Sequence, residues 1–166
     1  MKNIVLIGMP GSGKSTLGVL LAKFLGYDFV DMDIIIQNAT GKKLSEIIEE
    51  RGSEGFLDVE GEIVSGYKPE GNHPTIIATG GSVVYRESAM QNLRSIGKII
   101  YLSVPCEELE KRLHHLETRG VAIKEGMTFA ELYEERRPLY EKYADITVDE
   151  AGSSLSDIVE LMMHLA

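Results

Sequence analysis

The stretch Gly8-Met9-Pro10-Gly11-Ser12-Gly13-Lys14-Ser15 matches the pattern G-x-x-x-x-G-K-S at every position. It follows a short apolar segment, Asn3 to Ile7, and opens a segment with apolar residues at helical spacing, Lys14 to Leu25. A buried strand, a glycine-rich loop and a helix in this order form the context in which the pattern binds phosphate. Backbone N–H groups of the loop turn inward, and the helix N-terminus adds partial positive charge. We therefore predict that this loop holds the phosphates of a nucleotide.

Two side chains of this pattern contact the nucleotide and its metal ion. Lys14 reaches the β- and γ-phosphates, and the Ser15 hydroxyl can bind Mg²⁺. A dinucleotide site is disfavoured, because the third glycine of G-x-G-x-x-G after Gly11 and Gly13 would fall at Thr16. A glycine-rich turn that binds nothing is the weaker alternative in this context. The predicted nucleotide-binding residues of the loop are Gly11, Ser12, Gly13, Lys14, Ser15 and Thr16.

Strands alternate with helices along the rest of the chain, which predicts an α/β fold with a parallel sheet between two layers of helices. The predicted strands are 3–7, 27–30, 75–78, 98–103 and 145–148. The predicted helices are 14–25, 44–50, 55–65, 87–96, 107–116, 128–143 and 155–165. Ligands of such three-layer α/β/α folds bind at the carboxyl ends of the strands. Five residues of interest follow predicted strands: Gly8, Asp31, Asp33, Gly80 and Gly81.

Size and composition indicate one globular domain over residues 1–166, with 43% hydrophobic and 26% charged residues. The net charge of −9 disfavours nucleic acid as a partner, because such binding depends on clustered Lys and Arg. The single cysteine, Cys106, excludes an intrachain disulfide and fits a reducing compartment. Gly8 and Pro10 interrupt the first apolar run too early for a membrane span or signal peptide. We expect a cytoplasmic monomer without a membrane partner.

Asp31 and Asp33 form a D-x-D pair after the second predicted strand, which would place both side chains on one side of an extended segment. One carboxylate can help to hold Mg²⁺, and the other can hydrogen-bond an acceptor hydroxyl and draw off its proton. Two solvated acids at a strand end are the alternative. Gly80 and Gly81 end the third strand, where the backbone can approach a ligand closely, although a tight turn explains them almost as well.

The chain resembles the shikimate kinase family along nearly its whole length. The motifs that agree in order and spacing are the loop at 8–15, the D-x-D pair, Thr79-Gly80-Gly81 and the stretch Arg136-Arg137-Pro138-Leu139-Tyr140. The resemblance implies a P-loop kinase fold like that of nucleoside monophosphate kinases, with a substrate-binding region near 32–65 and a lid near 112–127. It also implies transfer of the γ-phosphate of ATP, with Mg²⁺, to a hydroxyl of a small metabolite.

The resemblance further implies roles for individual residues. Without it, Arg136 and Arg137 would be assigned to ion pairs on a solvated, glutamate-rich helix face, and Arg112 to ordinary helix surface. By position, the implied catalytic residues are Lys14, Asp33 and Arg119, the last as the lid arginine over the transferring phosphate. The implied metal-binding residues are Ser15 and Asp31, and Arg112 would pack against adenine. The implied substrate-binding residues are Asp33, Gly80, Gly81 and Arg136, with Arg136 holding a carboxylate.

Three departures from the family pattern fall on the acceptor side. Leu57 stands where F-R-x-x-E has an arginine, Ser82 replaces the third glycine of G-G-G, and the lid reads Arg119-Gly120-Val121-Ala122 instead of R-P-L-L. A guanidinium fork gives two charge-assisted hydrogen bonds to a carboxylate and leucine gives none. Two interpretations therefore stay open: an atypical shikimate kinase, or a relative that phosphorylates a different hydroxyl compound. A nucleotide-binding regulatory module without transfer is a third.

Overall fold

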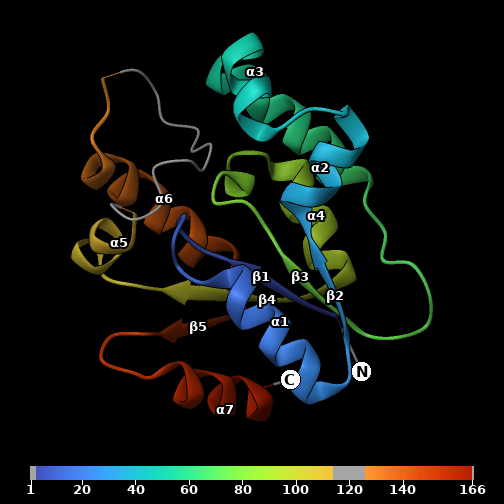
Figure 1. Ribbon diagram of the computed structural model, residues 1–166, viewed down its shortest axis with the longest axis vertical. Helices are drawn as coiled ribbons and strands as arrows, with labels where there is room; N and C mark the ends of the chain where they lie inside the picture. The colour runs from blue at the N-terminus through green and yellow to red at the C-terminus, as the bar shows by residue number, and fades with distance from the viewer. Residues whose placement is uncertain (1–2, 114–125, 166) are drawn as a thin grey trace.

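The computed structural model describes residues 3–113 and 126–165 of the chain, and its centre is a parallel sheet of five strands (Figure 1). The strands are β1 (Asn3–Ile7), β2 (Asp28–Asp31), β3 (Thr75–Ala78), β4 (Gly97–Ser103) and β5 (Ile146–Asp149). Their order across the sheet is β2-β3-β1-β4-β5, and all four neighbouring pairs are parallel. The predicted α/β fold with a five-stranded parallel sheet is confirmed.

Helices connect the strands. They are α1 (Lys14–Leu25), α2 (Met32–Thr40), α3 (Leu44–Gly66), α4 (Glu87–Ile96), α5 (Cys106–Leu113), α6 (Phe129–Tyr143) and α7 (Leu155–Leu165), with a short 3₁₀ turn η1 (Val83–Tyr85). Gly26 ends α1 with a φ of 69°, as predicted for a C-cap glycine. Among the described residues, no helix has the length and apolar character required to cross a membrane.

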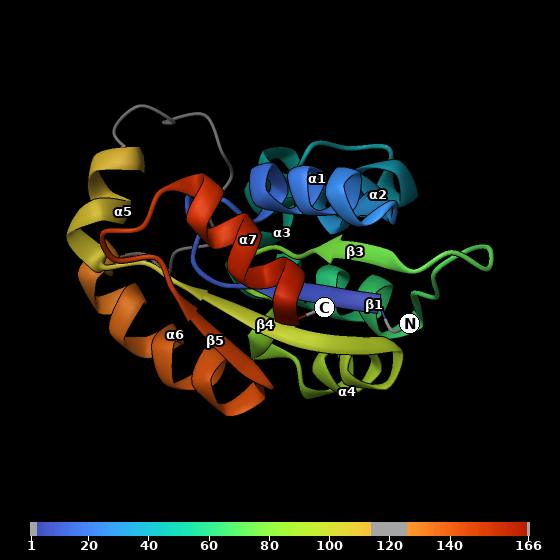
Figure 2. The ribbon, with the colours of Figure 1, turned by 90° about the horizontal axis from the view of Figure 1, so that it is seen from below.

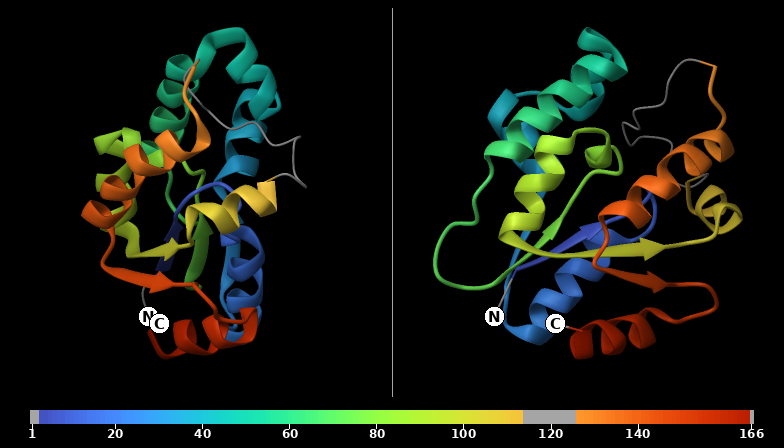
Figure 3. Two further views of the ribbon diagram at one scale, coloured as in Figure 1. Left: turned by 90° about the vertical axis from the view of Figure 1, so that its left-hand side faces the viewer. Right: turned by 180° about the vertical axis from the view of Figure 1, so that it is seen from behind.

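The side chains of β1 alternate between two buried layers, because successive residues of a strand point to opposite faces. Ile4 and Leu6 pack with residues of α1 and α7, while Val5 and Ile7 pack with residues of α4 and α6. Figures 2 and 3 show the same arrangement, with α1 on one side of the sheet and α4 and α6 on the other. Burial on both faces explains why β1 reads as a continuous apolar run.

The segment after β2 is helical, which corrects the prediction that the D-x-D pair lies on an extended strand. Asp31 is the last residue of β2 and the N-cap of α2, and its side chain accepts a hydrogen bond from the Asp33 N–H at 3.0 Å. Asp33 therefore belongs to the first turn of α2. An aspartate N-cap and the C-cap glycine Gly41 are ordinary helix signals, but the apolar run from Ile34 to Ile36 hides helical periodicity.

Helix α3 consists of two helical pieces that meet at Gly52, where φ is 70° and ψ is 175°. The predicted break at this glycine is confirmed, since only glycine adopts this conformation without strain. The second piece carries Phe56 and Glu60, which are one helical turn apart, so both lie on the same side of the helix. This side faces the loop that follows β1, and the two residues reach the pocket described below.

Candidate functional site

The loop between β1 and α1 has the backbone of a phosphate cradle. Gly8, Gly11 and Gly13 have φ values of 149°, 80° and 84°, which side-chain-bearing residues rarely adopt. A Cβ atom on Gly8 would lie 2.8 Å from the carbonyl oxygen of Leu102 on β4, so the neighbouring strand also requires glycine there. Gly13 is the N-cap of α1 and has no side chain to occupy the first N–H groups of the helix. These N–H groups are thus suited to hold an anion.

The ammonium group of Lys14 lies inside this loop. The residue is 8% exposed, and Nζ donates hydrogen bonds to the carbonyl oxygens of Gly8 and Met9 at 2.8 Å each and to Ser12 Oγ at 3.2 Å. A positive charge is therefore held at the centre of the curve formed by the loop backbone. This is the arrangement that suits phosphate oxygens, because charge and N–H donors converge on the same place.

Ser15 and Asp31 bring two oxygen ligands together at the start of α1. The Ser15 hydroxyl donates a hydrogen bond to Asp31 Oδ2 at 2.7 Å. Over residues 3–113 and 126–165, no group of three or more His, Cys, Asp or Glu side chains is placed to hold a metal ion. Magnesium does not need such a group, since it usually binds one or two protein oxygens, phosphate oxygens and water. The hydroxyl–carboxylate pair fits a magnesium ion of this kind.

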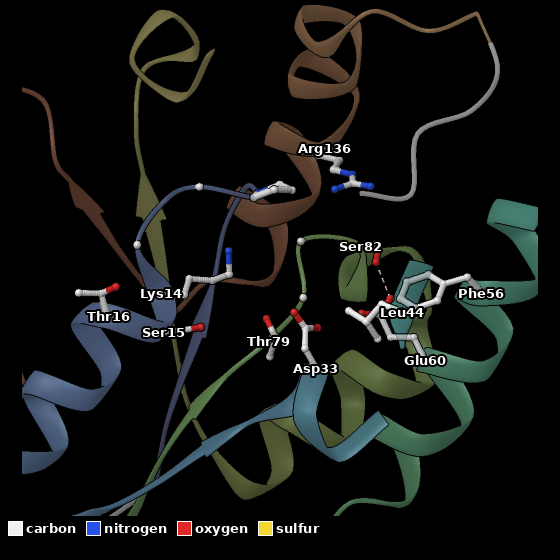
Figure 4. A pocket seen from close by; sticks show the side chains of 15 residues that line it. Lys14, Ser15, Thr16, Asp33, Leu44, Phe56, Glu60, Thr79, Ser82 and Arg136 are labelled. Carbon is white, nitrogen blue, oxygen red and sulfur yellow. Dashed lines mark hydrogen bonds between the residues drawn. The ribbon is translucent and has the colours of Figure 1, made fainter. Parts of the chain in front are cut away.

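One pocket joins this loop to the other predicted substrate residues (Figure 4). Its walls come from the loop after β1, from the start of α1, from α2, from α3, from the loop after β3 and from α6. The predicted residues that line it are Gly11, Gly13, Lys14, Ser15, Thr16, Asp33, Gly80, Gly81 and Arg136. Sequence reasoning did not assign a role to a further six lining residues, which are Pro10, Leu44, Phe56, Glu60, Thr79 and Ser82. The F-x-x-x-E spacing and the position of Thr79 and Ser82 beside the two glycines were available signals.

Gly80 and Gly81 have close neighbours at the position of a Cβ atom, and neither has a positive φ. A Cβ atom on Gly80 would lie 2.7 Å from Glu60 Oε1 and 3.1 Å from Asp33 Oδ1. On Gly81 it would lie 2.7 Å from Pro10 Cδ and 3.0 Å from a terminal nitrogen, Nη1, of Arg136. The two glycines let carboxyl and guanidinium groups approach the backbone of this loop.

Arg136 and its neighbour Arg137 differ completely in environment. Arg136 is 1% exposed, its guanidinium lies 5.2 Å from the ring centre of Tyr85, and its Nε donates to the Tyr85 oxygen at 3.3 Å. Arg137 is exposed and pairs with Glu134 at 3.1 Å and Glu141 at 3.2 Å. The alternative of a solvated ion-pair face therefore holds for Arg137 and is wrong for Arg136.

Glu60 is a buried carboxyl group in the wall of the pocket. Its Oε2 accepts a hydrogen bond from the Ser82 hydroxyl at 2.6 Å, and the residue is 2% exposed (Figure 4). Burial raises the pKa of Glu60 to about 7, and the nearby Asp33 adds to this effect. The hydrogen bond from Ser82 and the charge of Arg136 act in the opposite direction. Glu60 thus changes its charge close to neutral pH.

Leu57 lies outside the lining of this pocket. It is 5% exposed and packs in an apolar cluster with Ile36, Ile47 and Phe56. The next residue, Asp58, is on the surface and pairs with Arg86 at 2.7 Å, so its carboxylate is not part of the pocket wall. Leu57 therefore contributes apolar packing between α2 and α3 and is not part of the pocket wall.

Arg112 contacts the loop after β1 but does not line the pocket that Asp33 lines. Its Nη1 donates to the Gly11 carbonyl oxygen at 3.3 Å, and Nε donates to Glu108 at 3.2 Å. A second hollow, open to this arginine, is lined by Gly11, Ser12, Gly13, Thr16, Leu17, Arg112, Glu150, Ser153, Leu155 and Ile158. The lid arginine, Arg119, and most of the predicted lid fall within 114–125, outside the described residues.

Comparison with known proteins agrees with this geometry. The model of the family described as shikimate kinase matches residues 10–166. The chain belongs to the shikimate kinase family. The shikimate kinase of Thermodesulfovibrio yellowstonii is 40% identical over 162 residues, which cover 96% of this chain and 92% of that protein. That of Synechococcus is 40% identical over 166 residues, covering 98% and 83%.

Solved structures of the family have the same fold. The shikimate kinase of Acinetobacter baumannii in complex with shikimate is 28% identical and superposes with a TM-score of 0.86, covering 99% of this chain and 92% of that one. The Aquifex aeolicus enzyme is 30% identical, with a TM-score of 0.73 and coverage of 98% and 95%. The chain is thus an ATP-dependent phosphotransferase that acts on a hydroxyl group of a small molecule. The comparisons do not favour a different acceptor or a regulatory module without transfer.

Proposed function

We propose that the chain transfers the γ-phosphate of ATP to a hydroxyl group of shikimate. The observation that carries this proposal is the pocket in which Lys14, Asp33 and Arg136 line one space next to a complete phosphate loop. These residues supply a phosphate-binding cation, a carboxylate and a carboxylate-binding cation. The bound shikimate in the Acinetobacter baumannii relative supports the same acceptor.

The residues of the pocket divide the reaction between them. Lys14 and the N–H groups of the loop stabilise the phosphates as negative charge shifts during transfer. Asp33 accepts a hydrogen bond from the acceptor hydroxyl and takes up its proton, which directs the oxygen toward the γ-phosphate. Arg136 holds the acceptor carboxylate, so that the hydroxyl stays in place.

Ser15 and Asp31 would bind a magnesium ion beside the phosphates. The ion would supply positive charge that neutralises the phosphate oxygens. Arg112 would contact the adenine, and Arg119 would move over the γ-phosphate from the lid, residues 112–127. Residues 32–65 would form the acceptor-binding region of a single domain, 1–166. We further propose that the protein works as a monomer in the cytoplasm, without nucleic acid or membrane partners.

A leucine side chain cannot hydrogen-bond a carboxylate. Because of Leu57, we therefore expect the acceptor carboxylate to bind more weakly than in relatives with an arginine at this position. A hydrogen bond to a charged group contributes roughly 1.5–3 kcal/mol, so its loss corresponds to an affinity about ten- to a hundredfold lower. Arg136 then carries the carboxylate without a second guanidinium from α3. We expect a KM for shikimate that is raised by this factor, with phosphate transfer itself preserved.

The test is ADP release with ATP and Mg²⁺, comparing shikimate with sugar acids, hydroxy amino acids, polyols and nucleosides. We expect turnover of shikimate above the rest of the panel. Turnover of another compound without turnover of shikimate would contradict shikimate as the acceptor. No turnover of any compound would contradict the proposed phosphate transfer.

The same assay tests the loop. Lys14→Ala removes charge stabilisation of the transition state, so we expect activity to fall at least about a hundredfold with the circular dichroism spectrum unchanged. Near-full activity of this variant would contradict the assignment of the loop. Arg137→Ala, an exposed cation outside the pocket lining, is the matched control and should keep activity.

A further inference from the structure

Two carboxyl groups from different helices converge at Gly80. Asp33 Oδ1 comes from α2 and Glu60 Oε1 comes from α3, and they approach the same point, at 3.1 Å and 2.7 Å from the Cβ position of Gly80. Both residues line the acceptor pocket. The other oxygen of Glu60, Oε2, is held by the Ser82 hydroxyl at 2.6 Å. Glu60 is therefore fixed on one side and faces the pocket with the other.

Within the part of the chain that the structure describes, no direct ion pair neutralises Glu60. The charged groups around it are Asp33 on α2, Arg136 on α6 and Arg86 after η1. Arg86 is engaged by Glu54 at 3.2 Å and Asp58 at 2.7 Å, and its contact with Glu60 is only long-range. Ser82 provides a neutral hydrogen bond, which stabilises the carboxylate less than a salt bridge would.

An anionic acceptor adds a third carboxylate to this space and displaces water from it. Both changes disfavour the charged form of Glu60, because like charges repel and burial reduces solvation. Protonation of Glu60 removes the repulsion at little cost, since burial already brings its pKa to about 7. The neutral carboxyl group then has an O–H that can donate a hydrogen bond into the pocket.

We propose that Glu60 takes up one proton from solvent when the anionic acceptor binds, and that its protonated carboxyl donates a hydrogen bond to an acceptor hydroxyl. Ser82 acts as the positioning residue that holds Oε2 and leaves Oε1 to carry the proton. The proton stays on Glu60 during phosphate transfer and returns to solvent when the product leaves. This inference rests on the proposed function, because it takes shikimate as the acceptor.

Proton uptake makes acceptor affinity depend on pH with a definite sign. Below about pH 7, Glu60 already carries its proton in the free protein, so affinity is flat. Above it, binding must bring in the proton, and affinity falls by up to about tenfold per pH unit. The direction is fixed by linkage: a complex that binds more protons than the free protein is weakened as pH rises.

Calorimetry of shikimate binding without nucleotide measures this proton directly. Phosphates that titrate in the same range are then absent, and buffers of different ionisation enthalpy reveal how many protons enter. We expect little uptake at pH 6 and uptake approaching one proton at pH 8. Glu60→Gln should bind without uptake and with a flat pH profile. The matched control is Glu62→Gln, an exposed residue of the same helix, which should keep the uptake.

Ser82→Ala removes the hydrogen bond to Glu60 while the Glu60 carboxyl group remains available to take up the proton, and it provides a second test. Without the hydrogen bond from Ser82, the carboxylate of Glu60 is less stable. Proton uptake should therefore begin at a pH that is higher by about one unit. Binding of shikimate without proton uptake at pH 8 would overturn the inference and leave the proposed function standing. Uptake that persists in Glu60→Gln would also overturn it, since the proton would belong to another group. No binding heat and no turnover with shikimate would overturn the proposed function and this inference together.

Discussion

Replacement of Arg136 by lysine isolates the value of a guanidinium fork in the acceptor pocket. The buried arginine stacks on Tyr85 at 5.2 Å and hydrogen-bonds its hydroxyl oxygen, which in turn donates to Glu135 at 2.6 Å. Of its terminal nitrogens, Nη1 lies 3.0 Å from the Cβ position of Gly81, and the residue lines the pocket. Lysine keeps one positive charge but presents a single nitrogen, so it cannot bind a carboxylate with two parallel hydrogen bonds.

The magnitude follows from one lost charge-assisted hydrogen bond, roughly 1.5–3 kcal/mol. The KM for shikimate should therefore rise about ten- to a hundredfold in Arg136→Lys. Because the acceptor carboxylate is remote from the reacting hydroxyl, this contact is equally strong before and during transfer. We therefore expect kcat to change much less than KM.

The assay is steady-state ADP release at saturating ATP with shikimate varied. Arg137→Lys is the matched control, since Arg137 is the next residue of α6 and pairs only with surface glutamates in the described structure. It should keep wild-type constants. Equal KM values for the two variants would refute the assignment of Arg136, and a fall in kcat at unchanged KM would mean that Arg136 acts on the transfer step instead.

Three further changes test packing and electrostatics around the site. Tyr140→Phe removes the donor that binds the Gly81 carbonyl oxygen at 2.6 Å, so urea unfolding should show a loss of about 1–3 kcal/mol. Gly18→Ala places a Cβ atom 2.7 Å from Phe29 Cε2, and an unchanged melting temperature would contradict the expected loss of about 1–3 kcal/mol. Glu60→Gln should gain stability over the wild type as pH rises. The pKa of Glu60 is raised by folding to about 7, so its contribution is complete below pH 4.5 and is lost as pH rises through 7. Unfolding at pH 5 and pH 8 should show this gain growing by about 1–3 kcal/mol.

Local features of the chain were predicted well. The phosphate loop is eight consecutive residues, and its conformation depends on glycines within the loop and on the strand and helix beside it. The break in α3 at Gly52 and the end of α1 at Gly26 were found for the same reason. Short-range backbone preferences act over a few residues, so they are visible in the sequence. Helix α2 was missed because three consecutive isoleucines carry no helical period.

Side-chain environments were harder to predict. Arg136 and Arg137 occupy adjacent places in one glutamate-rich helix, and their sequence context is nearly the same. Burial of the first and exposure of the second depend on Tyr85, which is about 50 residues away in the chain and packs under only one of them. The resemblance to a family distinguished the two arginines by position, but it gave no physical reason for the difference.

The sequence by itself determined the order of the strands, the helices other than α2 and the phosphate loop, because these follow from patterns along contiguous residues, and the resemblance to a family added the class of reaction. Tertiary structure alone decided which side chains share the acceptor pocket. The Glu60–Ser82 hydrogen bond joins residues 22 positions apart, and Asp33 approaches both Gly80 and Glu60 from another helix. Such contacts depend on how helices pack over the sheet, and that packing also determines the burial that brings the pKa of Glu60 to about 7.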